Sequence, residues 1–198
     1  MELPTSSEPR ERADAARNRA RVLAAAERLL SERSDVTMEQ VAAAAGVGKA
    51  TLYRRYPDVA SIAQALLDEH ERELQEGLLR GAPPLGPGAP PAERLAAFYG
   101  AMVELLERHG HLALAGETGE RRYETGAYRA WALHVAALLE EAGLGESPAL
   151  VDALLAPLAP DVYAHQRAAG LSAREIAAGL ALLARRAMTS ERRAGPRT

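Results

Sequence analysis

Cysteine is absent from this 198-residue chain, which excludes disulfide bonds, thiolate metal sites and a cysteine nucleophile. No run of about 18 apolar residues occurs, so the sequence predicts no membrane-spanning helix. The opening residues, MELPTSSEPRER, lack the apolar core of a signal peptide, and we therefore expect a cytoplasmic protein. With 47% hydrophobic and 26% charged residues, the composition is typical of a soluble globular protein of one large or two small domains.

Lysine is almost absent as well: Lys49 is the only one, and the other 23 of the 24 basic residues are arginine. The abundance of Ala, Arg, Gly and Pro is typical of GC-rich coding bias, which accounts for most of these arginines. The segment from Arg10 to Tyr56 has ten basic and six acidic residues, a charge of +4, so the rest of this −3 chain carries −7. This modest asymmetry favours a polyanionic partner at the N-terminal end.

No convincing alternation of apolar and polar residues is present, whereas helical periodicity runs through most of the chain. The pattern predicts an all-α fold with helices at about 13–33, 38–45, 49–56 and 58–80, and further helices after residue 91. Thr37 fits an N-cap with Gln40 completing a capping box, Gly46 fits a tight turn, and Pro57 marks a boundary. Pro157 and Pro160 should interrupt a helical stretch at about 148–169, which precedes a last helix at about 172–189.

This pattern divides the chain into two domains with flanking tails. We expect a helix-turn-helix domain over 13–57 and a helical domain over 58–190, with disordered ends at 1–12 and 191–198. Residues 81–91, GAPPLGPGAPP, contain three glycines and five prolines and are predicted to form a semi-extended linker within the second domain.

Two short helices joined by a glycine turn are typical of the helix-turn-helix, whose second helix enters the major groove of DNA. Ala42 to Ala45 supply the small side chains that closely crossing helices need, and Val47 and Leu52 should anchor the second helix in the core. The predicted DNA-binding residues are Thr37, Gly48, Lys49, Ala50, Thr51, Tyr53, Arg54 and Arg55. Lys49 and Arg54 could donate to guanine or phosphate, and Tyr53 to phosphate. For Arg17, Arg19 and Arg21, contact with the DNA backbone and an ordinary charged surface are equally good interpretations.

The stretch TMEQVAAAAGVGKATLYRRYP, from Thr37 to Pro57, resembles the DNA-binding signature of the TetR family of transcriptional repressors. Gly48 stands where the family more often has a capping serine, and Tyr56 replaces a more usual phenylalanine. Val59 stands where a phosphate-contacting lysine is frequent, so that contact is not carried over.

The resemblance implies that the C-terminal helical domain forms a homodimer through its last two helices and binds a small-molecule effector. The apolar content of 148–189 supports a dimer independently, because two such helical pairs could bury it in a four-helix bundle. A two-fold dimer would bind a palindromic operator in double-stranded DNA. The larger side chains that could line an effector pocket are Phe98, Met102, Tyr128, Trp131 and Tyr163, although ordinary core packing is the better interpretation of each. His134 could bind a polar group of the ligand, although a surface or hydrogen-bonded histidine is the better interpretation.

A ligand would have to favour one of two helix arrangements, and LALAGETGE, from Leu112 to Glu120, is where we would expect movement. His109 and His111 lack nearby ligands at metal-binding spacing, and we expect neither metal nor cofactor. No motif of a hydrolase, nucleotide-binding or metalloenzyme site is present, so an enzyme is disfavoured. A helical ligand-binding dimer with a vestigial DNA domain remains the alternative. Within the DNA-binding class we expect a repressor, and the sequence leaves an activator open.

Overall fold

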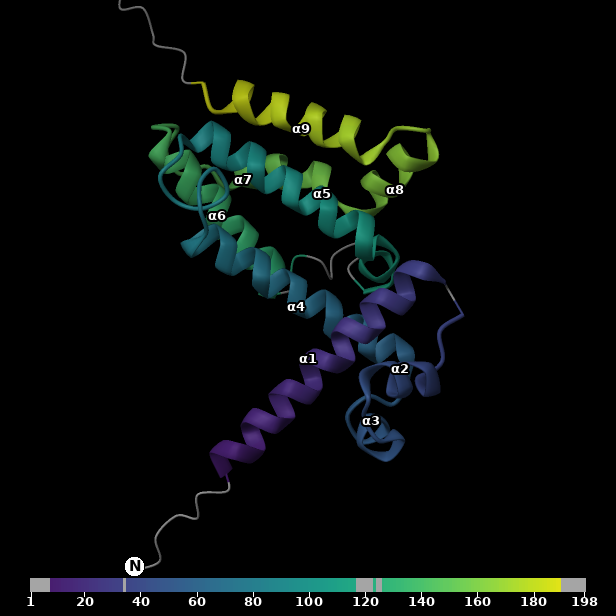
Figure 1. Ribbon diagram of the computed structural model, residues 1–198. Helices are drawn as coiled ribbons and strands as arrows, with labels where there is room; N and C mark the ends of the chain where they lie inside the picture. The colour runs from purple at the N-terminus through teal and green to yellow at the C-terminus, as the bar shows by residue number, and fades with distance from the viewer. Residues whose placement is uncertain (1–7, 34, 117–122, 124–125, 190–198) are drawn as a thin grey trace, which may run out of the picture. The chain divides into compact units, whose positions relative to one another are not determined.

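The computed structural model describes residues 8–33, 35–116, 123 and 126–189 of the chain. Over these residues it contains nine α-helices and no strand, which confirms the all-α prediction (Figure 1). None of the described helices has the length and hydrophobicity needed to cross a membrane. The chain forms two compact units, residues 1–69 and 70–198, and each is described by itself.

The first unit consists of α1 (Glu8–Glu32), α2 (Met38–Ala45), α3 (Lys49–Arg55) and the first half of α4 (Val59–Arg80). Its core is apolar and draws on all four helices, with Val22 and Ala26 from α1, Val41 from α2, Leu52 from α3 and Ile62 from α4. The α4 helix starts directly after Asp58, whose carboxylate accepts a 2.7 Å hydrogen bond from the amide of Ser61. The N-terminal half of α4 thus completes this core, and the division between units falls inside α4 rather than at the predicted Pro57.

The first helix is longer than the sequence pattern indicated. It begins at Glu8, within the segment for which disorder was expected, whereas residues 1–7 and the predicted tail 191–198 lie outside the described residues. Pro9 does not prevent this start, because proline is tolerated in the first turn of a helix, where its missing N–H would have no partner.

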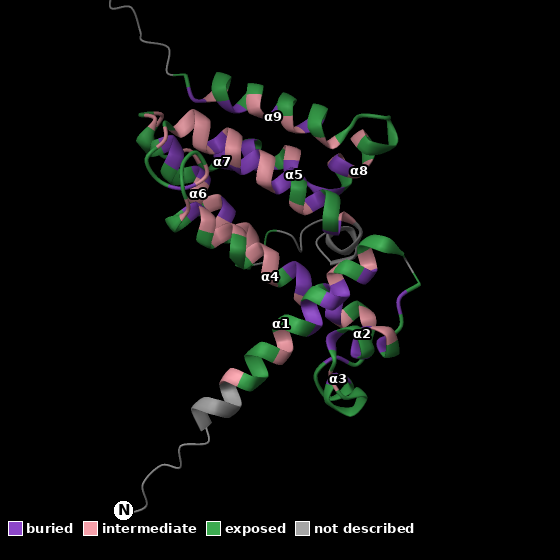
Figure 2. Ribbon diagram, viewed as in Figure 1, coloured by how far each residue is buried: buried purple, intermediate pink, exposed green. Residues whose placement is uncertain are grey.

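The second unit is built around α5 (Pro91–Gly116), which packs against α6 (Gly126–Glu141), α8 (Pro160–Ala168) and α9 (Ala173–Ala187). The helix α7 (Pro148–Leu155) lies against α6 and continues into a 3-10 turn, η2 (Ala156–Leu158), before α8 begins. The predicted interruption by Pro157 and Pro160 is therefore confirmed. Buried residues of α5, α6, α7, α8 and α9 form a second core, and Figure 2 marks the buried positions along these helices in purple.

The proline-rich linker is a compact turn rather than the semi-extended connection that its composition suggested. The amide of Gly86 donates a 3.0 Å hydrogen bond to the carbonyl of Ala82. A Cβ atom at Gly86 would lie 1.8 Å from the carbonyl oxygen of Gly81, so only glycine allows the backbone to fold back this tightly. Leu85 packs against the second core and anchors the turn.

Candidate nucleic-acid interface

The α2–α3 pair begins and turns through local interactions. The Thr37 hydroxyl accepts a 3.3 Å bond from the amide of Gln40, and the Gln40 side chain accepts a 2.9 Å bond from the Thr37 amide, which confirms the predicted capping box. Gly46 ends α2 with φ 62°, and its amide donates to Ala43 while that of Val47 donates to Ala42. These interactions fix the point at which the chain leaves α2.

The small residues of α2 are divided between the core and the surface. Ala42 and Ala45 are buried, whereas Ala43 and Ala44 are exposed, so only half of the alanine run provides the close contact that we expected of all four. Leu52 is only 2% exposed and Val47 packs partly against the same core, as predicted. The opposite face of α3 is thereby turned outward.

The predicted DNA-contacting residues of α3 are all exposed: Lys49, Ala50, Thr51, Tyr53, Arg54 and Arg55. Gly48 caps the helix without a side-chain hydrogen bond, so it gives up the hydroxyl that a serine would offer. Arg54 and Arg55 occupy the last turn, where positive charge also complements the helix dipole. A short cationic helix anchored by one buried leucine is suited to enter the major groove.

Glu39, in the first turn of α2, is the acidic residue that meets this face, and sequence reasoning missed it. Its carboxylate accepts a 3.3 Å hydrogen bond from the Tyr53 hydroxyl and lies 3.5 Å from the Lys49 ammonium. A hydrogen bond from its own backbone, and then the charge of Lys49, hold the pKa of Glu39 below its ordinary value. No local signal in the sequence indicates these contacts, because the partners are 10 and 14 residues away.

The three arginines of α1 that had two open interpretations all have partners within their own unit. Arg19 donates to the Tyr56 hydroxyl at 3.2 Å and to the carboxylate of Glu69 at 2.6 Å. Arg21 donates to the carbonyl of Gly46 at 3.0 Å, and Arg17 pairs with Asp14. Arg19 therefore ties α1 to the residue that ends α3, so the buried Tyr56 finds a protein partner rather than water for its hydroxyl.

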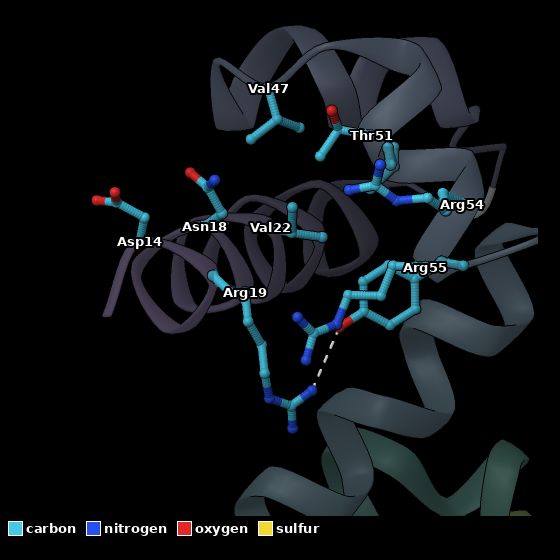
Figure 3. A pocket seen from close by; sticks show the side chains of 11 residues that line it. Asp14, Asn18, Arg19, Val22, Val47, Thr51, Arg54 and Arg55 are labelled. Carbon is cyan, nitrogen blue, oxygen red and sulfur yellow. Dashed lines mark hydrogen bonds between the residues drawn. The ribbon is translucent and has the colours of Figure 1, made fainter. Parts of the chain in front are cut away.

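A groove of about 480 Å³ separates α1 from α3 within the first unit (Figure 3). Asn18 and Val22 of α1 line one wall, and Thr51, Arg54 and Arg55 of α3 line the other. The guanidinium of Arg55 also lies 5.9 Å from the centre of the Tyr56 ring. The groove therefore combines cationic and polar side chains beside the exposed face of α3.

The predicted effector-pocket residues lie in or against the core of the second unit. Phe98, Met102, Trp131 and Tyr163 are buried there, and Tyr128 packs at its edge with its hydroxyl donating to Asp152 at 2.8 Å. Ordinary core packing thus accounts for the positions of these five aromatic and methionine side chains.

His134, the sixth predicted pocket residue, differs from the other five. Its Nε2 atom is buried without a hydrogen-bond partner, 5.3 Å separates its ring from that of Phe98, and Arg94 Nε is likewise buried without a partner. Desolvation, and then the positive charge of Arg94, lower the pKa of His134 to about 4. Sequence reasoning did not find Arg94, whose guanidinium also pairs with Glu141 at 2.9 Å.

Of the two histidines considered for metal binding, His109 is the one whose side chain the structure describes. His109 is buried and lies 2.7 Å from His70 of α4, measured between ring nitrogens, whereas the side chain of His111 falls outside the described residues. Among the side chains that the structure describes, no three histidine or carboxylate groups converge as metal ligands. Of LALAGETGE, residues 112–116 continue α5 and residues 117–120 lie outside the description.

Comparisons with known proteins agree with this geometry. Residues 22–66 match the sequence model of the bacterial regulatory proteins of the tetR family. The crystal structure of a TetR-like transcriptional regulator from Rhodococcus sp. RHA1 has the same fold, with a TM-score of 0.55 and 20% identity over 86% of this chain and 95% of that one. No curated protein matches the sequence.

The matched residues span the capped α2, the glycine turn and the exposed face of α3, which are the parts of a helix-turn-helix DNA-binding domain. The chain therefore carries a helix-turn-helix DNA-binding domain of the tetR family, as the resemblance of Thr37 to Pro57 implied.

Proposed function

We propose that the protein is a ligand-responsive repressor that binds a palindromic operator as a homodimer. The observation that carries the DNA-binding part is the exposed face of α3, which presents Lys49, Thr51, Tyr53, Arg54 and Arg55 from a helix anchored by Leu52. Thr37, at the N-terminus of α2, would donate its hydroxyl proton to a backbone phosphate, since its amide already donates to Gln40. These residues would position the domain and read base edges.

The dimer would form through α9. The outer face of this helix exposes Leu182, which is 56% exposed, together with Leu183 and Gly179. The inner face is already held by the second core and by Arg185, which donates to both carboxylate oxygens of Glu93 at 3.0 and 3.2 Å. An apolar stripe of this kind supports packing against a second copy, and two-fold symmetry fits a palindromic operator.

The effector would be recognised between α5 and α6. Arg94 Nε and His134 Nε2 are buried polar atoms without partners, and the His134 ring lies 5.3 Å from that of Phe98, which in turn contacts Trp131. Buried polar groups are normally hydrogen-bonded, and leaving one unpaired costs roughly 1–3 kcal/mol. A small apolar molecule with a hydrogen-bonding group would satisfy both atoms on entering this region.

A gel-shift assay with the DNA that flanks the protein's own gene tests the DNA-binding part, with a size measurement on the same sample. A retarded band together with a folded dimer supports the proposal. A folded dimer without a band at low salt would favour the alternative, a ligand-binding dimer with a vestigial DNA domain. Transcription from that promoter in vitro separates a repressor from an activator.

A thermal-shift screen of small molecules tests the effector part, because a ligand that binds only the folded state raises the melting temperature. Compounds that stabilise the wild-type chain but not His134→Ala would support recognition at this site. Equal stabilisation of both would contradict it.

A further inference from the structure

The acidic residue at the edge of the DNA-binding face is unexpected on electrostatic grounds. Between Gln40 and Pro57 the sequence contains no Asp or Glu, and Glu39 is the acidic residue that pairs with Lys49, one of the three cationic side chains of α3. Its side chain is 51% exposed. Phosphates repel such a carboxylate, so its position costs affinity for any duplex unless the carboxylate makes a favourable contact with the bases.

The contacts of Glu39 fix a hydrogen-bond acceptor beside a donor. Lys49 Nζ lies 3.5 Å from Glu39 Oε1, and the Tyr53 hydroxyl donates to the same oxygen at 3.3 Å. An ammonium has three N–H donors, so two remain on Lys49 after one turns to the carboxylate. The carboxylate likewise keeps free lone pairs. The two side chains can therefore present two donors followed by an acceptor.

This order of groups matches one base pair in the major groove. A G·C pair presents two acceptors, N7 and O6 of guanine, followed by the N4 donor of cytosine. A T·A pair read in the same direction presents a methyl group, then an acceptor and then a donor, so it lacks the first acceptor. The A·T and C·G pairs place the donor at a different position in the order. A lysine and a glutamate acting together thus distinguish G·C from the other three pairs.

We propose that Glu39 and Lys49 read a G·C pair in each operator half-site as one unit. Lys49 donates to N7 and O6 of guanine, and Glu39 accepts from N4 of cytosine. Tyr53 is a positioning residue that holds the carboxylate through its hydroxyl. The inference rests on the proposed DNA-binding function and adds a specificity determinant at the start of α2.

The experiment begins with selection of binding sites from a random duplex pool by the full-length protein. Dissociation constants are then measured on four duplexes that differ only at the selected G·C position, for wild type and Glu39→Ala. Glu32→Ala, which removes an exposed acid at the end of α1, is the matched control. Melting curves verify that all three proteins are folded.

We expect the wild type and Glu32→Ala to prefer G·C over each other pair by about tenfold or more. Glu39→Ala should lose most of this preference while binding unrelated DNA more tightly, because the repulsion of phosphate is gone. Replacing guanine by inosine should leave wild-type binding unchanged, since inosine keeps N7 and O6 and the N4 group of cytosine is retained.

Two results would overturn the inference while leaving the proposed function intact. In the first, the wild type binds a specific sequence that contains no required G·C pair. In the second, Glu39→Ala tightens binding to all four duplexes by one common factor. The latter would make Glu39 a general electrostatic brake. Failure of the wild type to select any sequence would instead overturn the proposed function itself, and the inference with it.

Discussion

Arg54 and Arg55, at the end of α3, are the cationic side chains whose role is easiest to measure. Each contact with a phosphate contributes about −0.9 to the slope of log affinity against log salt concentration. Arg54→Ala or Arg55→Ala should therefore weaken operator binding and flatten this slope by about one. Fluorescence anisotropy at several salt concentrations measures both quantities, with Arg174→Ala on α9 as the control. An unchanged slope in both variants would place the phosphate contacts elsewhere.

His134 links the stability of the second unit to pH. Burial and Arg94 lower the pKa of His134 from 6.5 to about 4 in the folded chain. Between pH 4 and pH 6.5 the imidazole is therefore protonated in the unfolded state and neutral in the folded state. Stability must then fall as pH drops from about 6.5 to about 4, by up to about 1.4 kcal/mol per pH unit. His134→Leu removes this contribution and should lose less stability than wild type between pH 7 and pH 4.5.

Urea unfolding followed by Trp131 fluorescence measures this difference, because the single tryptophan lies in the same core, with its ring 5.7 Å from that of Phe98. Parallel losses of stability in wild type and His134→Leu would show that the histidine does not resist protonation in the folded chain.

At the scale of the element, the turn between α2 and α3 depends on Gly46. Its φ of 62° lies in the left-handed region, and a Cβ atom there would lie 2.4 Å from Arg21 Nη2. Gly46→Ala should cost about 1–2 kcal/mol for the backbone strain and displace Arg21 from the Gly46 carbonyl. Thermal melts by circular dichroism measure the loss of stability.

Gly100→Ala is the control for this turn, because Gly100 lies inside α5, where alanine favours helix. A Cβ atom at Gly100 would have no neighbour within 4 Å, so the substitution meets no steric obstacle. The two variants should therefore shift the melting temperature in opposite directions. A neutral Gly46→Ala would contradict the account of the turn.

Elements with strong local signals were predictable from the sequence, and those that depend on distant contacts were not. Thr37, Gly46 and Pro157 act through their own backbone geometry or that of close neighbours, so the capping box, the turn and the interruption of the late helix were predicted correctly. The compactness of 81–91 and the early start of α1 were missed, since proline and glycine counts do not report tertiary packing.

In the candidate site, too, the features that depend on local sequence were predictable and those that depend on distant contacts were not. Periodicity predicted which residues of α3 face outward, because one buried leucine fixes the orientation of a short helix. The contacts of Glu39 with Lys49, and the approach of Arg94 to His134, join residues 10 and 40 positions apart and arise only from the packing of helices. Sequence patterns of a single helix therefore could not reveal them.

For the whole molecule, the account requires two copies joined through α9. Leu182→Glu places a charge on the stripe proposed to be buried between copies, and it should convert a dimer into a monomer of 21.1 kDa. Leu133→Glu is the matched control, because Leu133 on α6 is 73% exposed and lies outside that stripe. Sedimentation equilibrium distinguishes the two forms. A monomeric wild type, or a dimer in which Leu182→Glu has no effect, would contradict this interface.

The central claim is that α3 enters the major groove with Lys49 to Arg55 facing the bases. Footprinting of the wild-type protein on the DNA flanking its gene, beside the double variant Lys49→Ala/Arg54→Ala, tests it most directly. The account predicts a protected palindrome for the wild type and loss of that protection in the folded double variant. Undiminished protection by the double variant would contradict it.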